Sequence, residues 1–241
     1  MAYQDRSRLT ELGFLNDTAD FQVGSRRSFL EELNPKDRAL LKTMTPEFMD
    51  LRGKALLRQA YLNYPAFTCR SEILSETLSP VEIAYVRRSW NTDHSPCLFT
   101  IGYEGLTIDA YLNRLICSNI KAMVDVRSNP HSMKHDFRKN KLRQHLETVG
   151  IKYYHIPELG IPSDRRQSLD SPRAYQRLFR EYENHVLPTQ TQAIRRLFEL
   201  FSQCQRVALT CFEADYRYCH RHKIAEYMEH IPSFEATVSH L

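Results

Sequence analysis

Short apolar runs alternate with helix-like patterns after residue 96, and this alternation restricts the fold more than any other feature. Apolar spacing typical of helices lies between and after the runs. Strands that alternate with helices pair in parallel through right-handed crossovers, so that helices cover both faces of the sheet. The sequence therefore predicts an α/β fold with a parallel sheet of about four strands: Cys97–Gly102, Ala122–Val126, Lys152–Ile156 and Arg206–Cys211.

The helices expected around this sheet follow from caps and apolar spacing. Thr107 is placed to cap a helix with an apolar face from Tyr111 to Ile116. Further helices are predicted around 142–149, over 175–186, over 194–201 and from about 219 to 229.

The first ninety-odd residues read as helical throughout. A capping residue followed by proline marks a helix start, because proline suits the first helical turn. Ser79-Pro80 also has Glu82 three residues after the serine, which is the pattern of a capping box. Apolar residues from Phe48 to Leu62 nearly keep helical spacing and predict an amphipathic helix. The other two predicted helix starts are Asn34-Pro35 and Thr45-Pro46.

A polar, turn-rich segment, 90–96, separates these helices from the strands. We therefore predict a small helical domain over 1–95 and an α/β domain over 96–241. The first part carries 13 basic and 13 acidic residues, so the formal net charge of +4 belongs to the second. With 42% hydrophobic and 26% charged residues the chain can bury a core, which excludes a low-complexity or disordered protein.

No apolar run approaches the ~18 residues that a membrane helix needs, and the first residues do not resemble a signal peptide. These features predict a cytoplasmic protein without a membrane partner. The 6 cysteines include no Cys-x-x-Cys pair, which favours reduced thiols over a disulfide framework. The oligomeric state is not predicted.

Unusual polar residues follow every predicted strand. Ligands of parallel α/β sheets bind beyond the carboxyl ends of the strands, so we expect these residues to converge on one site. Asp125 and Arg127 are two apart and should project to the same face, where they either form a structural salt bridge or share an anion. The other segments are Gly102–Gly105, Pro157–Gly160 and Cys211–Glu213.

Cys211 is the first candidate for a reactive group. At the end of a buried strand it is either an inert packed thiol or, facing a helix N-terminus, a thiol activated toward thiolate. Cys219-His220-Arg221 opens the last predicted helix, where free backbone N–H groups favour an anion. Together with Cys211 and Glu213 this segment also offers ligands for zinc or iron, although the seven-residue interval between the cysteines differs from the usual spacing of structural zinc.

The segment 127–143 has the most uneven charge in the chain, with six cations against Asp136 alone. It either steers an anionic small molecule or nucleic acid toward the site or forms a solvated helix surface. Phe137 is the single aromatic residue among the cations, and nothing here is typical of base-sequence recognition.

Five segments in order over about residues 98–227 resemble the DUF488 family (domain of unknown function 488). This resemblance implies a Rossmann-like α/β domain and supplies no established reaction. The chain departs from the family pattern after Pro130 and at Tyr216, and 64–72 resembles the end of a winged-helix-like region found in longer members. The matching segments are Thr100–Gly105, Val124–Pro130, Gly150–Ile151 with Tyr153, His155–Ser163, and Cys211–Asp215 with Cys219–Arg221.

These observations lead to an enzyme hypothesis with an anionic substrate that is nucleotide or nucleic-acid related. Cys211 would be the nucleophile or a metal ligand, and Glu213 or His220 would move protons. The alternative is a non-catalytic nucleic-acid accessory or a ligand- or metal-binding domain. The proposed catalytic residues are Cys211, Glu213, His220, Asp125 and Glu158, the substrate-binding residues are Tyr103, Glu104, Arg127, Ser132 and Arg221, and the metal ligands are Cys211, Cys219 and His220.

Overall fold

The computed structural model describes residues 33–48, 51–69, 71–162, 165 and 171–241. The chain divides into two compact units, Met1–Leu56 and Leu57–Leu241. In the first unit, helix α2 (Pro35–Phe48) begins after Asn34, whose Oδ1 accepts a hydrogen bond from the Asp37 amide at 2.9 Å. This confirms the predicted start at Asn34.

The helix start predicted at Thr45-Pro46 is wrong, because α2 continues through both residues. A capping residue followed by proline is a local preference for a helix start, and here the helix that began at Pro35 continues through Pro46, although proline is ordinarily unfavourable beyond the first turn.

Helix α3 (Lys54–Asn63) spans the division between the units, and three short helices follow it: η2 (Pro65–Thr68), α4 (Leu74–Thr77) and α5 (Pro80–Arg88). The predicted capping box of α5 is confirmed, with Ser79 and Glu82 bonded reciprocally. Helix α3 is shorter than the predicted amphipathic stretch, which began at Phe48. The amide of Ala66 donates to Asn113 of the α/β region at 2.9 Å. The domain boundary at 95/96 stays a prediction.

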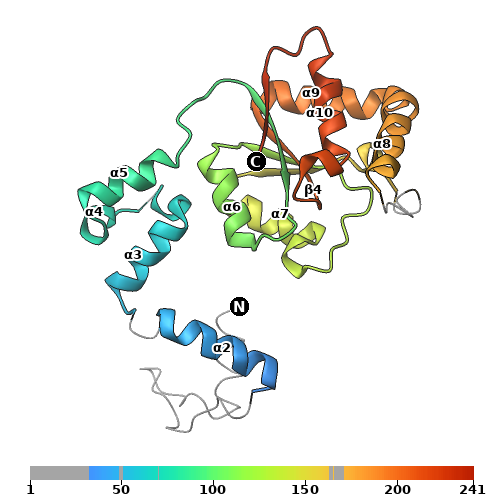
Figure 1. Ribbon diagram of the computed structural model, residues 1–241. Helices are drawn as coiled ribbons and strands as arrows, with labels where there is room; N and C mark the ends of the chain where they lie inside the picture. Colours follow the sequence, from blue (N-terminus) through green and yellow to red (C-terminus); the bar gives the residue numbers. More distant parts are fainter. Residues whose placement is uncertain (1–32, 49–50, 70, 163–164, 166–170) are drawn as a thin grey trace. The chain divides into compact units, whose positions relative to one another are not determined.

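A single parallel sheet of five strands forms the centre of the second unit, in the order β3-β2-β4-β1-β5. Helices surround this sheet (Figure 1). The α/β prediction is confirmed, and its count of about four strands misses β5. That strand has four residues, of which only Val238 is apolar, so its sequence carries no apolar run. The strands are β1 (Cys97–Gly102), β2 (Ala122–Asp125), β3 (Lys152–His155), β4 (Arg206–Cys211) and β5 (Thr237–His240).

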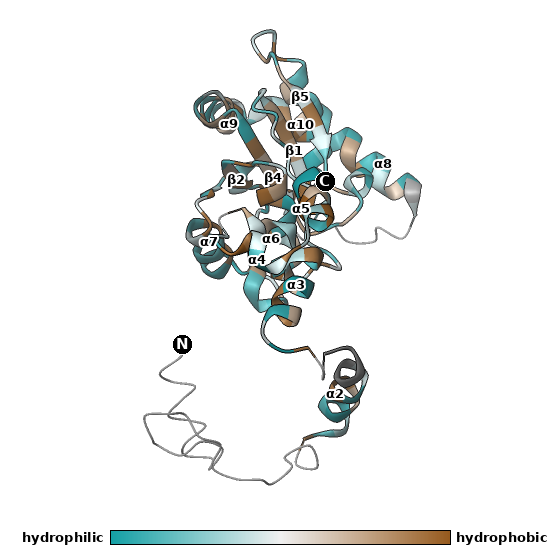
Figure 2. Cartoon of the chain, turned by 90° about the vertical axis from the view of Figure 1, so that its left-hand side faces the viewer, coloured by the Kyte–Doolittle hydropathy of each residue, from teal (hydrophilic) through white to brown (hydrophobic). Residues whose placement is uncertain are grey.

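Helices cover both faces of this sheet. On one face α6 (Ile108–Cys117) and α7 (Lys139–Thr148) pack against Phe99, Met123 and Tyr153. Opposite lie α8 (Pro172–Glu181), α9 (Thr191–Cys204) and α10 (Arg221–Glu229), packed against Val124 and Leu209. The flanking helices accordingly carry both hydrophilic and hydrophobic segments (Figure 2).

Short helical turns complete the loops around the sheet. A π-helical turn, Tyr182–Val186, directly follows α8. The 3-10 turns are η3 (His135–Phe137), η4 (Pro157–Leu159), η7 (Leu187–Thr189) and η8 (Tyr216–Tyr218). Within the described ranges, no helix combines the length and the apolar character that crossing a bilayer requires.

Candidate functional site

The polar residues after the strands meet at one carboxyl edge, but their side chains divide between the two faces of the sheet. Strands β2 and β4 are neighbours, and Asp125 is in register with Thr210. Because successive side chains alternate between faces, Asp125 points toward α6 and α7 while Cys211 points toward α10. The residues expected in one site therefore form two clusters.

The first cluster is a closed network around Asp125 and Arg127. The Arg127 guanidinium donates to both carboxylate oxygens of Asp125, from Nε to Oδ1 at 2.8 Å and from Nη2 to Oδ2 at 2.6 Å. The hydroxyl of Tyr153 donates to Oδ2 at 2.7 Å. Nη1 of Arg127 donates to the hydroxyl of Tyr103 and to the carbonyl of Phe137. Of the two roles predicted for this pair, the structure shows the salt bridge.

Two groups of this network, Tyr153 and Arg127, have raised pKa values. Burial and the negative charge of Asp125 raise the pKa of Tyr153. Burial alone would lower the pKa of Arg127, but the hydrogen bonds and charge of Asp125 raise it above its ordinary value. Four of the five guanidinium N–H groups are used internally, so anion binding by Arg127 stays a prediction with one donor to serve it.

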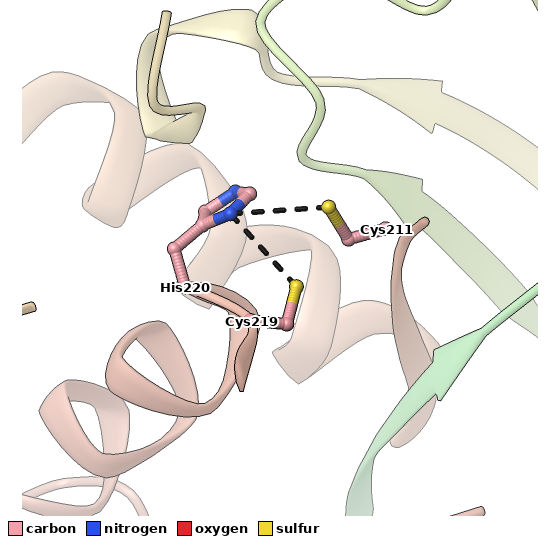
Figure 3. A group of neighbouring side chains, drawn as sticks. All are labelled: Cys211, Cys219 and His220. Atoms are coloured by element: carbon pink, nitrogen blue, oxygen red, sulfur yellow. Dashed lines mark hydrogen bonds between the residues drawn. The ribbon is translucent and has the colours of Figure 1, made fainter. Parts of the chain in front are cut away.

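The second cluster brings together Cys211, Cys219 and His220 (Figure 3). Cys211 ends β4, whereas Cys219 and His220 directly precede α10. The Nδ1 atom of His220 lies 3.8 Å from the Cys211 sulfur and 3.9 Å from the Cys219 sulfur. The three potential ligand atoms all lie within 4.8 Å of one another. The side chains are 0–1% exposed.

The backbone of Val126 fixes the chemical state of His220. The Nε2 atom of His220 lies 3.0 Å from the Val126 carbonyl oxygen. A carbonyl oxygen only accepts hydrogen bonds, so Nε2 carries a proton, and this tautomer turns the lone pair of Nδ1 toward the two sulfurs. A metal-ligating histidine is held in the same way, through a carbonyl bonded to its other nitrogen.

The fit of a zinc ion follows from these separations. Zinc binds sulfur at about 2.3 Å and imidazole nitrogen at about 2.0–2.1 Å, so two ligand atoms of a tetrahedral centre are roughly 3.5–3.8 Å apart. The sulfur-to-nitrogen distances of 3.8 and 3.9 Å are close to this range. Two thiols and one imidazole are also ligand types that zinc prefers. Cys211, Cys219 and His220 therefore fit the ion.

Arg221 holds the loop that covers the cluster. Its guanidinium donates to the carbonyls of Glu213 at 2.6 Å and Ala214 at 3.0 Å. Glu104 supports the same loop by accepting from the Ala214 amide at 3.0 Å. Gly102 permits this close approach, since a Cβ there would lie 1.8 Å from the Glu213 carbonyl oxygen. Substrate binding by Arg221 and Glu104 stays a prediction.

The thiol of Cys219 is held neutral in the absence of a metal. Burial, the neighbouring Cys211 and the charge of Glu213 all raise its pKa, and they outweigh the opposing effect of Arg221. The buried Nε of Arg221 has no hydrogen-bond partner in the described structure.

The remaining predicted residues lie apart from the sulfur cluster. Ser132 is buried in the loop after β2, where its hydroxyl accepts from the Lys134 amide at 3.1 Å. Tyr103 belongs to the Asp125 network. Glu158 is exposed and lines a cavity beside η4. Their catalytic or binding roles stay predictions.

Sequence reasoning missed two groups that contact His220. One is the Val126 carbonyl, which no sequence pattern identifies because every residue carries one. The other is Tyr182, whose ring lies 5.8 Å from the imidazole of His220. Tyr182 lies within the helix predicted over 175–186, and its spacing there indicates an apolar face but no contact with His220.

Together, the parallel sheet and the polar clusters at its carboxyl edge define an α/β domain of the Rossmann-like class. The sequence model of the DUF488 family, which is described as a domain of unknown function, matches residues 107–228. The chain belongs to this family, and the match agrees with the resemblance noted over about 98–227. No curated protein and no solved structure matches the chain.

Proposed function

We propose that the DUF488 domain of this chain is an enzyme with a zinc centre held by Cys211, Cys219 and His220. The observation that carries the proposal is the convergence of two sulfurs and one imidazole Nδ1 within 4.8 Å. The Val126 carbonyl supports it by keeping Nδ1 unprotonated.

A three-ligand site favours catalysis over a purely structural role. Structural zinc sites have four protein ligands, whereas catalytic sites have three and leave a position for water or substrate. Among the described residues, the group that can hold a metal has three members. Zinc at an open position supplies a Lewis acid that polarises a bound oxygen. In this proposal Glu213, which follows Cys211 by two residues, moves the proton.

The anionic substrate remains part of the proposal. It is supported by the excess of positive charge in the predicted α/β part and by the basic segment 127–143, which follows β2 at the edge of the sheet. A cytoplasmic location is also part of the proposal, and it rests on the sequence alone.

Thiol catalysis is a second candidate, favoured by the contact between the Cys211 sulfur and Nδ1 of His220. In that case His220 would accept the thiol proton and Cys211 would attack the substrate. Against it stands the second sulfur, since Cys219 lies about as close to Nδ1 of His220 (3.9 Å) as Cys211 does (3.8 Å), whereas a nucleophile–base pair requires only one thiol. The zinc centre is therefore the function that the geometry supports best.

The test is elemental analysis of the native full-length protein beside two single variants. We expect about one zinc per chain in the wild type and in the control Cys204→Ser, and less than a tenth of that in Cys219→Ser. Cobalt substitution should add thiolate-to-metal absorption that is absent from Cys219→Ser. A metal-free wild type that also fails to take up cobalt would eliminate the zinc centre and leave thiol catalysis.

A further inference from the structure

A cavity of about 560 Å³ opens beside the sulfur cluster. Its walls come from the loop after β2, from η4 and the residues that follow it, and from α8 with the π-helical turn. Single π-helical turns occur frequently at functional sites. The residues that line the cavity include Glu158, Ile161, Leu178, Tyr182 and Val186.

The cavity lies where this fold class binds ligands. Strands β2 and β3 are neighbours, yet β2 is followed by α7 on one face and β3 by α8 on the other. A crevice forms at the carboxyl ends of adjacent strands whose connections leave toward opposite faces, and ligands of open α/β sheets bind there. Ser128, which follows β2, and Glu158, which follows β3, both line the cavity.

Tyr182 connects this cavity to the proposed zinc centre. It lines the cavity, and its ring lies against His220 with centroids 5.8 Å apart. Its hydroxyl donates to the Leu159 carbonyl at 2.5 Å, and this hydrogen bond holds the ring between the cavity and His220. A ligand in the cavity is therefore separated from the zinc ligands by one aromatic side chain.

The lining favours a flat, partly apolar group that carries a hydrogen-bond donor. Ile161, Leu178 and Val186 supply apolar surface, and Tyr182 supplies an aromatic one. Arg165 and Glu181 offset each other's charge, with Nη1 and Oε1 3.8 Å apart. Glu158 has no ion pair in the described structure, so its carboxylate can accept a hydrogen bond from a ligand. Carboxylates recognise the exocyclic amino group of a nucleobase in this way.

A second cavity of about 360 Å³ shares Glu158, Thr189 and Gln190 with the first. It also contains Arg196, which is exposed on α9 and has no acidic partner among the residues described. A guanidinium is suited to bind phosphate oxygens through two parallel hydrogen bonds. The two cavities thus offer a site for a base and a site for a phosphate on either side of Glu158.

We infer that the two cavities together form the substrate pocket and take a nucleotide with an amino-bearing base. Glu158 selects the amino group, and Arg196 binds the phosphate. This inference rests on the proposed enzyme function and names the substrate class of that site. A keto group in place of the amino group would direct an oxygen acceptor at the Glu158 carboxylate and weaken binding.

Isothermal titration of the full-length protein with CMP, UMP and cytidine tests the inference. We expect CMP to bind at least about tenfold more tightly than UMP, which corresponds to one discriminating base contact. The Glu158→Gln variant should reduce this ratio below about threefold, because an amide offers a donor to the keto group. The matched control Glu199→Gln, on the exposed part of α9, should leave the ratio unchanged.

The phosphate contact is tested separately. Arg196→Gln should weaken CMP about tenfold and leave cytidine unchanged, whereas Arg195→Gln on the same helix should change neither. Equal affinities for CMP and UMP, or no binding of either at millimolar concentration, would overturn the inference. Zinc content measured in the same samples separates the two proposals: zinc without base discrimination contradicts only the pocket, and discrimination without zinc contradicts only the metal centre.

Discussion

The Asp125–Arg127 network and the Cys211–Cys219–His220 cluster lie at the same edge of one sheet and differ in how their polar groups are satisfied. In the network, Asp125 receives both guanidinium bonds and the Tyr153 hydroxyl. In the cluster, two sulfurs face one lone pair on Nδ1 of His220. The network is a buried ion pair with added hydrogen bonds, whereas the cluster consists of three groups that can each supply a metal ligand.

This difference separates a scaffold from a site. Both clusters are joined through consecutive residues of one loop, because the Val126 carbonyl accepts from His220 and Arg127 follows directly. The buried ion pair holds this loop in place, and the loop in turn orients the imidazole. A buried, hydrogen-bonded ion pair is thus suited to position a neighbouring imidazole through the backbone.

Removing Asp125 should have the largest effect of the changes considered. Asp125→Ala leaves the Arg127 guanidinium buried without its carboxylate, and breaking a buried ion pair costs about 3–5 kcal/mol. Urea denaturation should show this loss in the free energy of unfolding. The control Glu199→Ala breaks an exposed helix pair and should cost at most about 0.5 kcal/mol. Equal losses in the two variants would contradict a closed, buried network.

Metal removal should act on the cluster alone. A ligand present at a hundredfold excess over its dissociation constant stabilises the folded state by about 2.7 kcal/mol, so a chelator should lower the unfolding free energy of the wild type by about that amount. Cys219→Ser should not respond to the chelator, and Tyr153→Phe, which alters the other cluster, should respond like the wild type. A chelator response that survives Cys219→Ser would place the metal elsewhere.

A smaller effect is expected from Tyr153→Phe. The substitution removes one hydrogen bond to the buried Asp125 carboxylate, and bonds to charged groups contribute about 1.5–3 kcal/mol. We expect a loss near the lower bound, because both guanidinium bonds remain. Tyr154→Phe on the same strand is the matched control, since its side chain packs on the opposite face. Urea denaturation of both variants measures the difference.

The smallest expected effect is a difference in the rate at which buried thiols are alkylated. Burial raises the pKa of Cys117 to about 11, so its alkylation should be slow at pH 8 and should accelerate as the pH approaches that value. This protection should not depend on a chelator. Cys211 and Cys219 should become more reactive together once the chelator removes the metal. Mass-spectrometric mapping of alkylation with and without chelator distinguishes the two kinds of protection.

Local sequence signals predicted most of the fold. The apolar run Cys97–Gly102 and the cap at Thr107 coincide with β1 and the start of α6. Strand β5 was missed because its residues show neither an apolar run nor an alternation of apolar and polar residues. It forms a strand because it pairs with β1. Helix α2 continues past Thr45-Pro46, so a capping residue followed by proline is a local preference that a helix already begun can override.

The site was predicted less completely, for a geometric reason. The topology brings Asp125 and Cys211 to one edge, as their positions after strands predict. Which face each side chain takes depends on the register between β2 and β4, and a shift of one residue would have placed both on the same face. Register is set by packing across the whole sheet and is not written in either strand alone.

The pairing of β1 has a consequence for the order of folding. Both of its neighbours, β4 and β5, lie far later in the chain, and Thr100 contacts His240 across 140 residues. Closing such long loops is entropically costly and slows folding of parallel sheets. During synthesis β1 therefore emerges with two unpaired edges and waits for most of the domain. This interval is when the chain is most exposed to aggregation, and when a chaperone would have the most effect on its yield.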